Sequence, residues 1–230
     1  MKHILSKRND RLFGVLLMEF LLLSDIMKFH LWISIIFLIP TSGCLGWGED
    51  IEISSEIQEE PLRIVFESPT LDRSEDLGAT VNLDEQLRTS PVLLFWVSPH
   101  CGGCHNWTQN IIDEGHYARW NDSNELQLLS IHRYIEFEDS ESMMEVYGNQ
   151  SSSEYTPWPI LVPDPNSRAI DLDSGMILSE SISEAFDNPP TPSLFLINQE
   201  AEIIWKAESY YYDELEIQEI DNILEQQLES

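Results

Sequence analysis

Two cysteines, Cys101 and Cys104, are separated by two glycines and flanked by His100 and His105 in the stretch FWVSPHCGGCHNW. Three chemistries use this spacing: a redox-active dithiol, half of a metal site, and the attachment of c-type haem. The spacing alone is compatible with all three, so the surrounding elements have to distinguish among them.

The residues around the pair predict a buried strand followed directly by a helix. Residues 91–98, PVLLFWVS, are continuously apolar, as in a strand buried on both faces at the centre of a sheet. From Cys101 to about Arg119 the apolar residues recur at helical spacing. A cysteine in the first turn of a helix meets unpaired N–H groups and the positive end of the dipole, which favour the thiolate. We therefore expect Cys101 to attack, Cys104 to resolve the mixed disulfide, and a protonated His100 to support the thiolate.

Two alternatives place a cofactor on the pair. CGGCH matches the haem-attachment pattern literally, but a small cytochrome rarely places that motif after a buried strand. Zinc or copper would accept Cys101, Cys104, His100 and His105 as ligands. Adjacent His and Cys on one tight turn cannot all converge on an ion, and the sequence has no second cysteine pair. We therefore expect no cofactor.

A third alternative is a non-catalytic binding module in which the disulfide is only structural. A bridge that closes so short a loop constrains little of the unfolded chain, so stabilisation is a poor reason for it. We favour a reversible dithiol. The direction of electron transfer stays open, because the reduction potentials of such dithiols range from about −120 to −270 mV. Reductants, oxidants and isomerases all use such a pair.

A second candidate site residue lies far along the chain, where Thr191-Pro192 precedes the apolar run at 193–198. Proline is tolerated as the first residue of a strand. A cis X-Pro bond occurs in only about 5–6% of cases in folded proteins, and it is useful where backbone must turn towards a substrate. Pro192 is the candidate for such a bond.

The order of elements predicts one α/β domain. Strands alternate with helices up to about residue 165, and a hairpin at 192–209 and a closing helix follow, which indicates a mixed sheet with helices on both faces. Residues 166–190 are expected to be irregular with one short helix. The aromatic residues at 209–215 are expected to pack the last helix.

This order resembles the thioredoxin fold. LGATVNLDEQLRTSPVLLFWVSPHCGGC and TPSLFLINQEAEIIWKAES are similar to membrane-tethered thiol-disulfide oxidoreductases of the TlpA and cytochrome-c-maturation type. The resemblance covers about residues 63–229. It implies that Cys101 is the attacking thiol, Cys104 the resolving thiol, and Pro192 a cis-proline beside them.

The sequence departs from that family in three places, and from classical thioredoxins, which bury an acid in the strand before the motif, in a fourth. Gly102 and Gly103 stand where the family has a proline inside the motif, WVSPHC is one residue longer, and Ala201 replaces a glycine at the hairpin turn. The strand at 91–98 carries no carboxylate to accept a proton, which leaves the two flanking histidines or water for that role.

The N-terminus reads as a signal or anchor segment at 1–43. Residues 27–44, MKFHLWISIIFLIPTSGC, have a basic start, an apolar run of nine residues that is too short to span a bilayer, and small residues before Cys44. The end resembles a prokaryotic lipobox, which implies lipidation of Cys44. The preceding 1–26 are interpreted as an over-extended reading frame.

The predicted signal or anchor segment also determines how the rest of the chain is divided. Residues 44–62 are acidic and predict a flexible tether, and 63–230 form the thioredoxin-like domain. The domain is expected outside the cytoplasm and anchored to the cell membrane, where disulfides persist. Lipid on Cys44 leaves Cys101 and Cys104 as a closed pair.

The net charge of −29 argues against a nucleic-acid partner, whose phosphates need basic residues. The expected partners are secreted or membrane-exposed proteins with thiols or disulfides. A membrane-side electron donor or acceptor would restore the pair.

Overall fold

The computed structural model describes residues 63–228. The predicted anchor segment at 1–43, Cys44 and the predicted tether at 44–62 lie outside this range, so the interpretations that rest on them stay predictions. Within the described range, the helices are all too short or too polar to cross a membrane.

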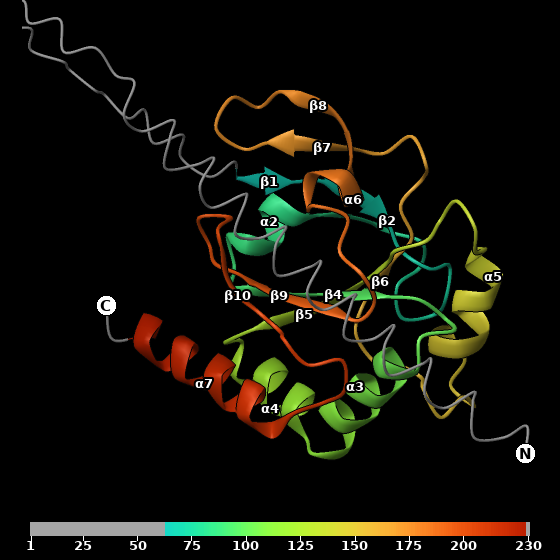
Figure 1. The fold of residues 1–230 in the computed structure, drawn as a ribbon, viewed down its shortest axis with the longest axis vertical. Coiled ribbons are helices and arrows are strands. Elements are labelled where there is room, and N and C mark those ends of the chain that lie inside the picture. Colours follow the sequence, from blue (N-terminus) through green and yellow to red (C-terminus); the bar gives the residue numbers. More distant parts are fainter. Residues whose placement is uncertain (1–62, 229–230) are drawn as a thin grey trace, which may run out of the picture. The chain divides into compact units, whose positions relative to one another are not determined.

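A five-stranded mixed sheet forms the centre of the domain (Figure 1). Its strand order is β10 (Ile203–Lys206), β9 (Ser193–Ile197), β4 (Val92–Val97), β5 (Gln127–His132) and β6 (Ile160–Leu161). The middle strand pairs in parallel with β5 and antiparallel with β9, and all of its residues are buried. The prediction of a central strand buried on both faces is therefore confirmed, as is the hairpin of β9 and β10.

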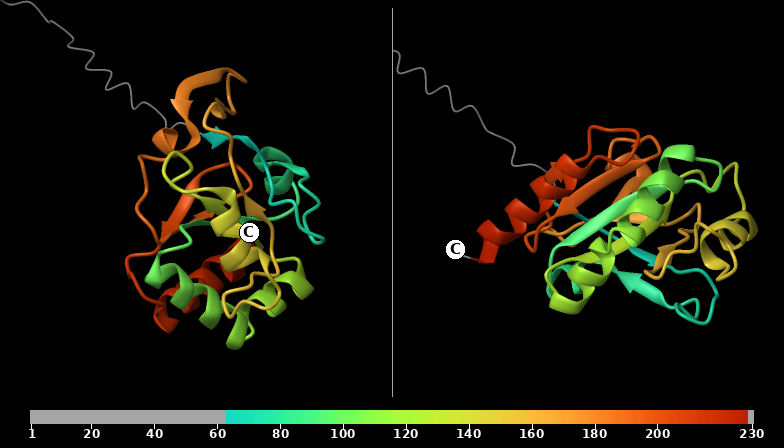
Figure 2. Two further views of the ribbon diagram at one scale, coloured as in Figure 1. Left: turned by 90° about the vertical axis from the view of Figure 1, so that its right-hand side faces the viewer. Right: turned by 90° about the horizontal axis from the view of Figure 1, so that it is seen from below.

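Three helices cover one face of this sheet: α3 (Gly102–Asp113), α4 (His116–Ser123) and α7 (Glu214–Leu228) (Figures 1 and 2). The single helix expected up to about Arg119 is in fact two helices. Gly115 adopts a left-handed φ of 77°, which only glycine adopts readily, and this ends the first helix. The closing helix buries Ile217, Ile220 and Leu224, as its periodicity predicts.

The other face is covered mainly by a second, small sheet rather than by long helices. Strand β1 (Ile64–Val65) pairs with β7 (Arg168–Asp171), which pairs with β8 (Ile177–Ser181). The short helices α2 (Leu83–Leu87) and α6 (Ile182–Ala185) complete this layer. Helices therefore lie on both faces, as expected, although those on this face are short. The expectation of irregular chain at 166–190 is wrong in part: α6 is the short helix expected there, but strands β7 and β8 were not anticipated.

The remaining elements are short and lie outside the two main layers. Strands β2 (Glu67–Pro69) and β3 (Thr80–Asn82) form an antiparallel pair. Helix α5 (Ser140–Met143) continues as a π-helical turn, Met144–Gly148, as the helical prediction at 139–148 requires.

The side chains of β4 alternate between two apolar clusters. Leu93, Phe95 and Val97 pack with the helices, in the same cluster as both cysteines. Leu94 and Trp96 pack on the opposite face, against the small sheet. Each large side chain buried in this way contributes about 1.5–3 kcal/mol. The strand is therefore held from both sides, and its C-terminal end has a fixed position.

A buried ion pair joins Arg73 to Asp76, and both side chains are only 3% exposed. The guanidinium of Arg73 also donates to the carbonyl oxygens of Tyr147, Thr156 and Trp158. One cation thus fixes the loop before α2 to the segment between α5 and β6.

Replacing Arg73 with Met is expected to lower the free energy of unfolding by about 3–5 kcal/mol, because the Asp76 carboxylate would stay buried without its partner. Equilibrium unfolding in urea measures the loss. Arg88→Met is the matched control: the Arg88 side chain is 72% exposed, and such a surface pair contributes less than about 1 kcal/mol. Equal losses in the two variants would contradict this role of Arg73.

Candidate active site

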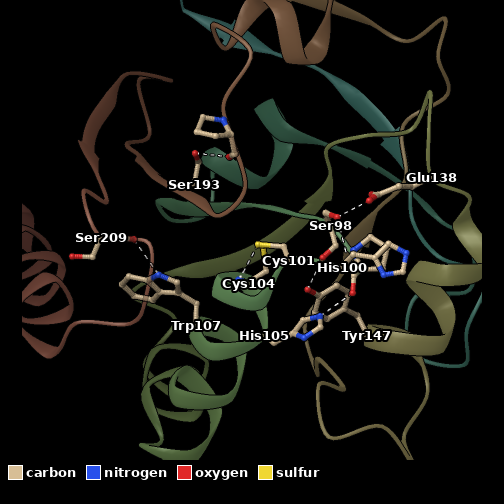
Figure 3. The surroundings of a disulfide bond; sticks show 12 residues. Ser98, His100, Cys101, Cys104, His105, Trp107, Glu138, Tyr147, Ser193 and Ser209 are labelled. Atoms are coloured by element: carbon tan, nitrogen blue, oxygen red, sulfur yellow. Dashed lines mark hydrogen bonds between the residues drawn. A yellow bond between two sulfur atoms is a disulfide. The ribbon is translucent and has the colours of Figure 1, made fainter. Parts of the chain in front are cut away.

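The cysteine pair lies where β4 ends and α3 begins (Figure 3). Cys101 is the residue just before the first helical turn, and its Sγ accepts a hydrogen bond of 3.1 Å from the backbone N–H of Cys104. The two residues form a disulfide, with their Cα atoms 5.2 Å apart. The predicted strand-to-helix position of the pair is confirmed.

The two cysteines differ in access. Cys101 is 7% exposed, whereas Cys104 is completely buried. Cys101 thus keeps a small exposed surface, whereas Cys104 has none. After the bond opens, the sulfur of Cys101 would lie at the N-terminus of α3, where unpaired N–H groups and the helix dipole stabilise a thiolate. The geometry suits the predicted division of roles, which itself stays a prediction.

Pro192 lies directly against the motif. The Thr191-Pro192 bond is cis, as expected, and the hydroxyl of Ser193 donates to the carbonyl oxygen of Pro190 in the same loop (Figure 3). A Cβ atom added to Gly103 would be 2.9 Å from Cδ of Pro192 and would clash with the carbonyl oxygen of Tyr210. The structure thus brings together Cys101, Cys104 and Pro192. It also gives a packing reason for the glycine at 103, in the motif where the family that this sequence resembles has a proline.

The loop between β10 and α7 forms another wall of the site, which the sequence did not reveal. The indole N–H of Trp107 donates to the carbonyl oxygen of Ser209, and the Tyr212 ring packs on Trp107. Tyr210 and Tyr211 are 50% and 61% exposed. The expectation that the whole aromatic run packs the last helix is therefore wrong for these two residues, since three consecutive side chains cannot all face one core.

Hydrogen bonds from three directions hold the short segment before Cys101. The carbonyl oxygen of Ser98 accepts from the Tyr147 hydroxyl at 3.0 Å and from the backbone N–H of Cys101 at 3.2 Å. The Ser98 hydroxyl donates to Glu138 at 2.7 Å. Figure 3 shows these residues beside the disulfide. The extra residue in WVSPHC is thus part of an ordered loop.

Glu138 is the carboxylate that accepts a hydrogen bond from this loop, and sequence reasoning missed it. Its other oxygen lies 3.0 Å from Nε2 of His132, which is only 3% exposed. Burial lowers the pKa of His132 below its usual value, although Glu138 opposes the shift. The imidazole is therefore largely neutral at pH 7. A histidine at the end of a buried strand, with an acid six residues later, was the available signal.

The two histidines beside the cysteines have different surroundings. His100 is exposed, and its backbone N–H lies 3.4 Å from the Ser98 hydroxyl oxygen. Nε2 of His105 lies 2.9 Å from the carbonyl oxygen of Pro99, so this nitrogen carries the hydrogen and donates. Neither ring bonds a sulfur. In the described part of the chain, no three His, Cys, Asp or Glu side chains are grouped so that they could hold a metal ion.

The chain matches no protein-family model, and no curated protein matches it in sequence. Solved structures do share its fold. The thioredoxin domain of a thiol-disulfide oxidoreductase from Bacteroides vulgatus is 13% identical, with a TM-score of 0.51 over 71% of this chain and 95% of that chain. A 2-Cys peroxiredoxin from Plasmodium vivax is 12% identical, with a TM-score of 0.51 over 72% and 95%.

A thiol-disulfide oxidoreductase from Bacteroides fragilis is 13% identical, with a TM-score of 0.48 over 70% of this chain and 98% of that chain. The chain therefore has a mixed α/β fold of the thioredoxin type. Its disulfide joins two cysteines that are two residues apart at the start of a helix.

Replacing Gly103 with Ala is expected to lower the free energy of unfolding by about 1–3 kcal/mol, because the new methyl group collides with Pro192 and with backbone of the Tyr210 loop. Gly102→Ala is the matched control: nothing lies within 4 Å of an added Cβ there, and alanine suits a helix better by up to about 1 kcal/mol. Urea unfolding of both variants measures the difference. Equal stability of the two would contradict the close contact at Gly103.

Proposed function

We propose that this protein exchanges thiols and disulfides with protein substrates outside the cytoplasm. The observation that carries the proposal is the pairing of a slightly exposed Cys101 with a fully buried Cys104 at a helix N-terminus, in a motif that lies against Pro192. Many structural neighbours with this fold are thiol-disulfide oxidoreductases, which supports redox chemistry as a class.

The exchange follows from this geometry in two displacements. In the oxidised protein, a substrate thiolate attacks Sγ of Cys101, the bond to Cys104 breaks, and Cys104 leaves as a thiolate. A second substrate thiolate then attacks the substrate sulfur of the mixed disulfide and releases the Cys101 thiolate. The substrate loses two electrons and two protons, and the protein dithiol gains them. Run in reverse, Cys101 attacks a substrate disulfide and Cys104 resolves it.

The other uses of the motif suit this geometry less well. Attachment of a c-type haem needs both sulfurs free to form thioethers, and Cys104 has no exposed surface. A purely structural bridge between residues three apart would add little stability, because it closes a very short loop.

The location is part of the proposal. The signal-like segment before Cys44 and its lipobox-like end support export and attachment to the membrane surface through lipid. A disulfide also persists better outside the cytoplasm than inside it. A membrane-side donor or acceptor of electrons would then return Cys101 and Cys104 to their starting state.

Cys104→Ser is expected to trap mixed disulfides between Cys101 and partner proteins, because the resolving thiol is missing. Cys101→Ser is expected to abolish both exchange and trapping. Non-reducing gels followed by mass spectrometry of the trapped species measure both effects. The Cys44→Ser/Cys104→Ser double variant is the control and should trap the same species, since Cys44 takes no part. Full exchange activity in Cys101→Ser would overturn the proposal.

A further inference from the structure

A cavity of about 360 Å³ lies on the face of the central sheet opposite α3. Trp96 of β4 and His132 of β5 line it from the sheet, and Ser179 of β8 and Glu184 of α6 line it from the small layer on that face. Figure 1 shows β7, β8 and α6 on one side of the central sheet and α3 on the other. The cavity therefore belongs to the part of the fold that sequence reasoning missed.

Two arginines that form no salt bridge with a described residue line the cavity. Seven of the twelve lysines and arginines lie in the described range, and four of these form ion pairs with aspartates: Arg63, Arg73, Arg88 and Arg119. The other three form no ion pair with any described residue: Arg133, Arg168 and Lys206. Two of these three, Arg133 and Arg168, line this one cavity. These two arginines carry the positive charge of the cavity lining, beside the carboxylates of Glu136, Asp164 and Glu184.

Both guanidinium groups have nitrogens that form no hydrogen bond with a described residue. Arg133 uses Nε for the carbonyl oxygen of Pro189 and Nη2 for Asn188. Arg168 uses Nη1 for the carbonyl oxygens of Pro165 and Ser167. Within the described residues, Nη1 of Arg133 and both Nε and Nη2 of Arg168 form no hydrogen bond. These nitrogens are available to a ligand.

The carboxylates that line the cavity are engaged elsewhere or exposed. Asp164 accepts from Asn166 in its own turn, and Glu184 accepts from Ser181 in a capping box. Glu136 is exposed. Hydrogen bonds from Ser181 and, to a smaller extent, the charge of Arg168 lower the pKa of Glu184, although Glu184 and Arg168 form no salt bridge.

Trp96 provides a second, independent observation. Its side chain is 1% exposed, it lines the cavity, and its indole N–H is buried without a hydrogen-bond partner among the described residues. Buried donors nearly always have a partner, and an unmet one costs about 1–3 kcal/mol. A ligand that brings acceptor oxygens would satisfy it together with the arginines.

The cavity and the disulfide are joined by one loop. Arg133 holds the carbonyl oxygen of Pro189, and Pro192, three residues later, lies against Gly103 of the motif. An extended polypeptide advances about 3.3–3.6 Å per residue. A substrate chain whose cysteine lies at Cys101 and which follows this loop would bring a residue up to about three positions from the cysteine to the cavity.

We propose that this cavity binds a segment of the substrate polypeptide through an acidic side chain next to the reacting cysteine, with Arg168 and Arg133 as its partners. The inference rests on the proposed function and adds a substrate preference to it. A polypeptide fits better than a small free anion, because serine hydroxyls and the Trp96 ring line the cavity beside the arginines. The preference also runs against the net charge of −29, which by itself would repel an acidic substrate.

The test uses ten-residue peptides whose single cysteine forms a mixed disulfide with thionitrobenzoate. Cys101 of the reduced protein attacks the peptide sulfur and releases the coloured thiolate, and Cys104 then releases the peptide thiol as the protein disulfide re-forms. One peptide has two Asp residues beside its cysteine, and the other has two Asn. After correction for the reactivity of each peptide with dithiothreitol, we expect the Asp peptide to react about tenfold faster, as for about 1.4 kcal/mol of extra interaction.

Matched variants locate the effect. Arg168→Gln should reverse the preference in favour of the Asn peptide, and Arg168→Lys should keep much of it. Lys206→Gln makes the same charge change over the ring of Phe195, away from the cavity, and should leave the preference intact. Lys206→Gln should react normally with dithiothreitol, and the peptide rates of each variant are divided by its own rate with dithiothreitol. No preference for Asp, or an equal effect of Lys206→Gln and Arg168→Gln, would overturn the inference.

A binding measurement separates this inference from the proposed function. Calorimetry with the oxidised protein and an Asp peptide whose cysteine is replaced by serine should detect binding that Arg168→Gln weakens about tenfold. Citrate serves as the probe for a small-anion site, and binding of citrate without binding of the peptide would overturn the inference. Absence of exchange with every peptide and with dithiothreitol would contradict the proposed function. Calorimetry would still show whether the cavity binds the Asp peptide.

Discussion

The position of Cys101 at the N-terminus of α3 is the constraint on which the rest of the site depends. It exists because β4 is buried on both faces and ends at a fixed point, Val97, four residues before the cysteine. The bonds of the Ser98 carbonyl group then leave the chain little freedom before the helix begins. Cys101 thus keeps a small exposed surface, while Cys104, one turn later, is completely buried.

The domain builds two different surroundings on the two sides of that strand. On the helical side, Pro192 and the Tyr210 loop close on Gly103 so tightly that no side chain fits. On the opposite side, the small sheet leaves a cavity that collects two arginines and a buried indole donor. The loop that ends in Pro192 contacts both, since Arg133 holds its Pro189 carbonyl. Chemistry and recognition can therefore share one short segment of chain.

The sequence predicted the features whose signal is local. The apolar run of β4, the helix after the cysteines and the strand-initiating Pro192 are each visible within about ten residues. It could not predict β7 and β8, because β7 pairs with β1, about a hundred residues earlier, and β8 shows no alternation of buried and exposed residues. The contact of Gly103 with Tyr210 and the bond of Ser98 to Glu138 likewise join distant positions. Such contacts leave no periodic trace in a single sequence.

The most direct test of the central claim is the pH dependence of alkylation of the reduced protein by iodoacetamide, with the modified cysteine located by mass spectrometry. The account predicts that Cys101 is modified first and with a midpoint below the ordinary thiol pKa of about 8.5, because the start of α3 stabilises its thiolate. Cys104 should stay protected in the core. Equal modification of the two cysteines, or a midpoint for Cys101 at or above about 8.5, would contradict it.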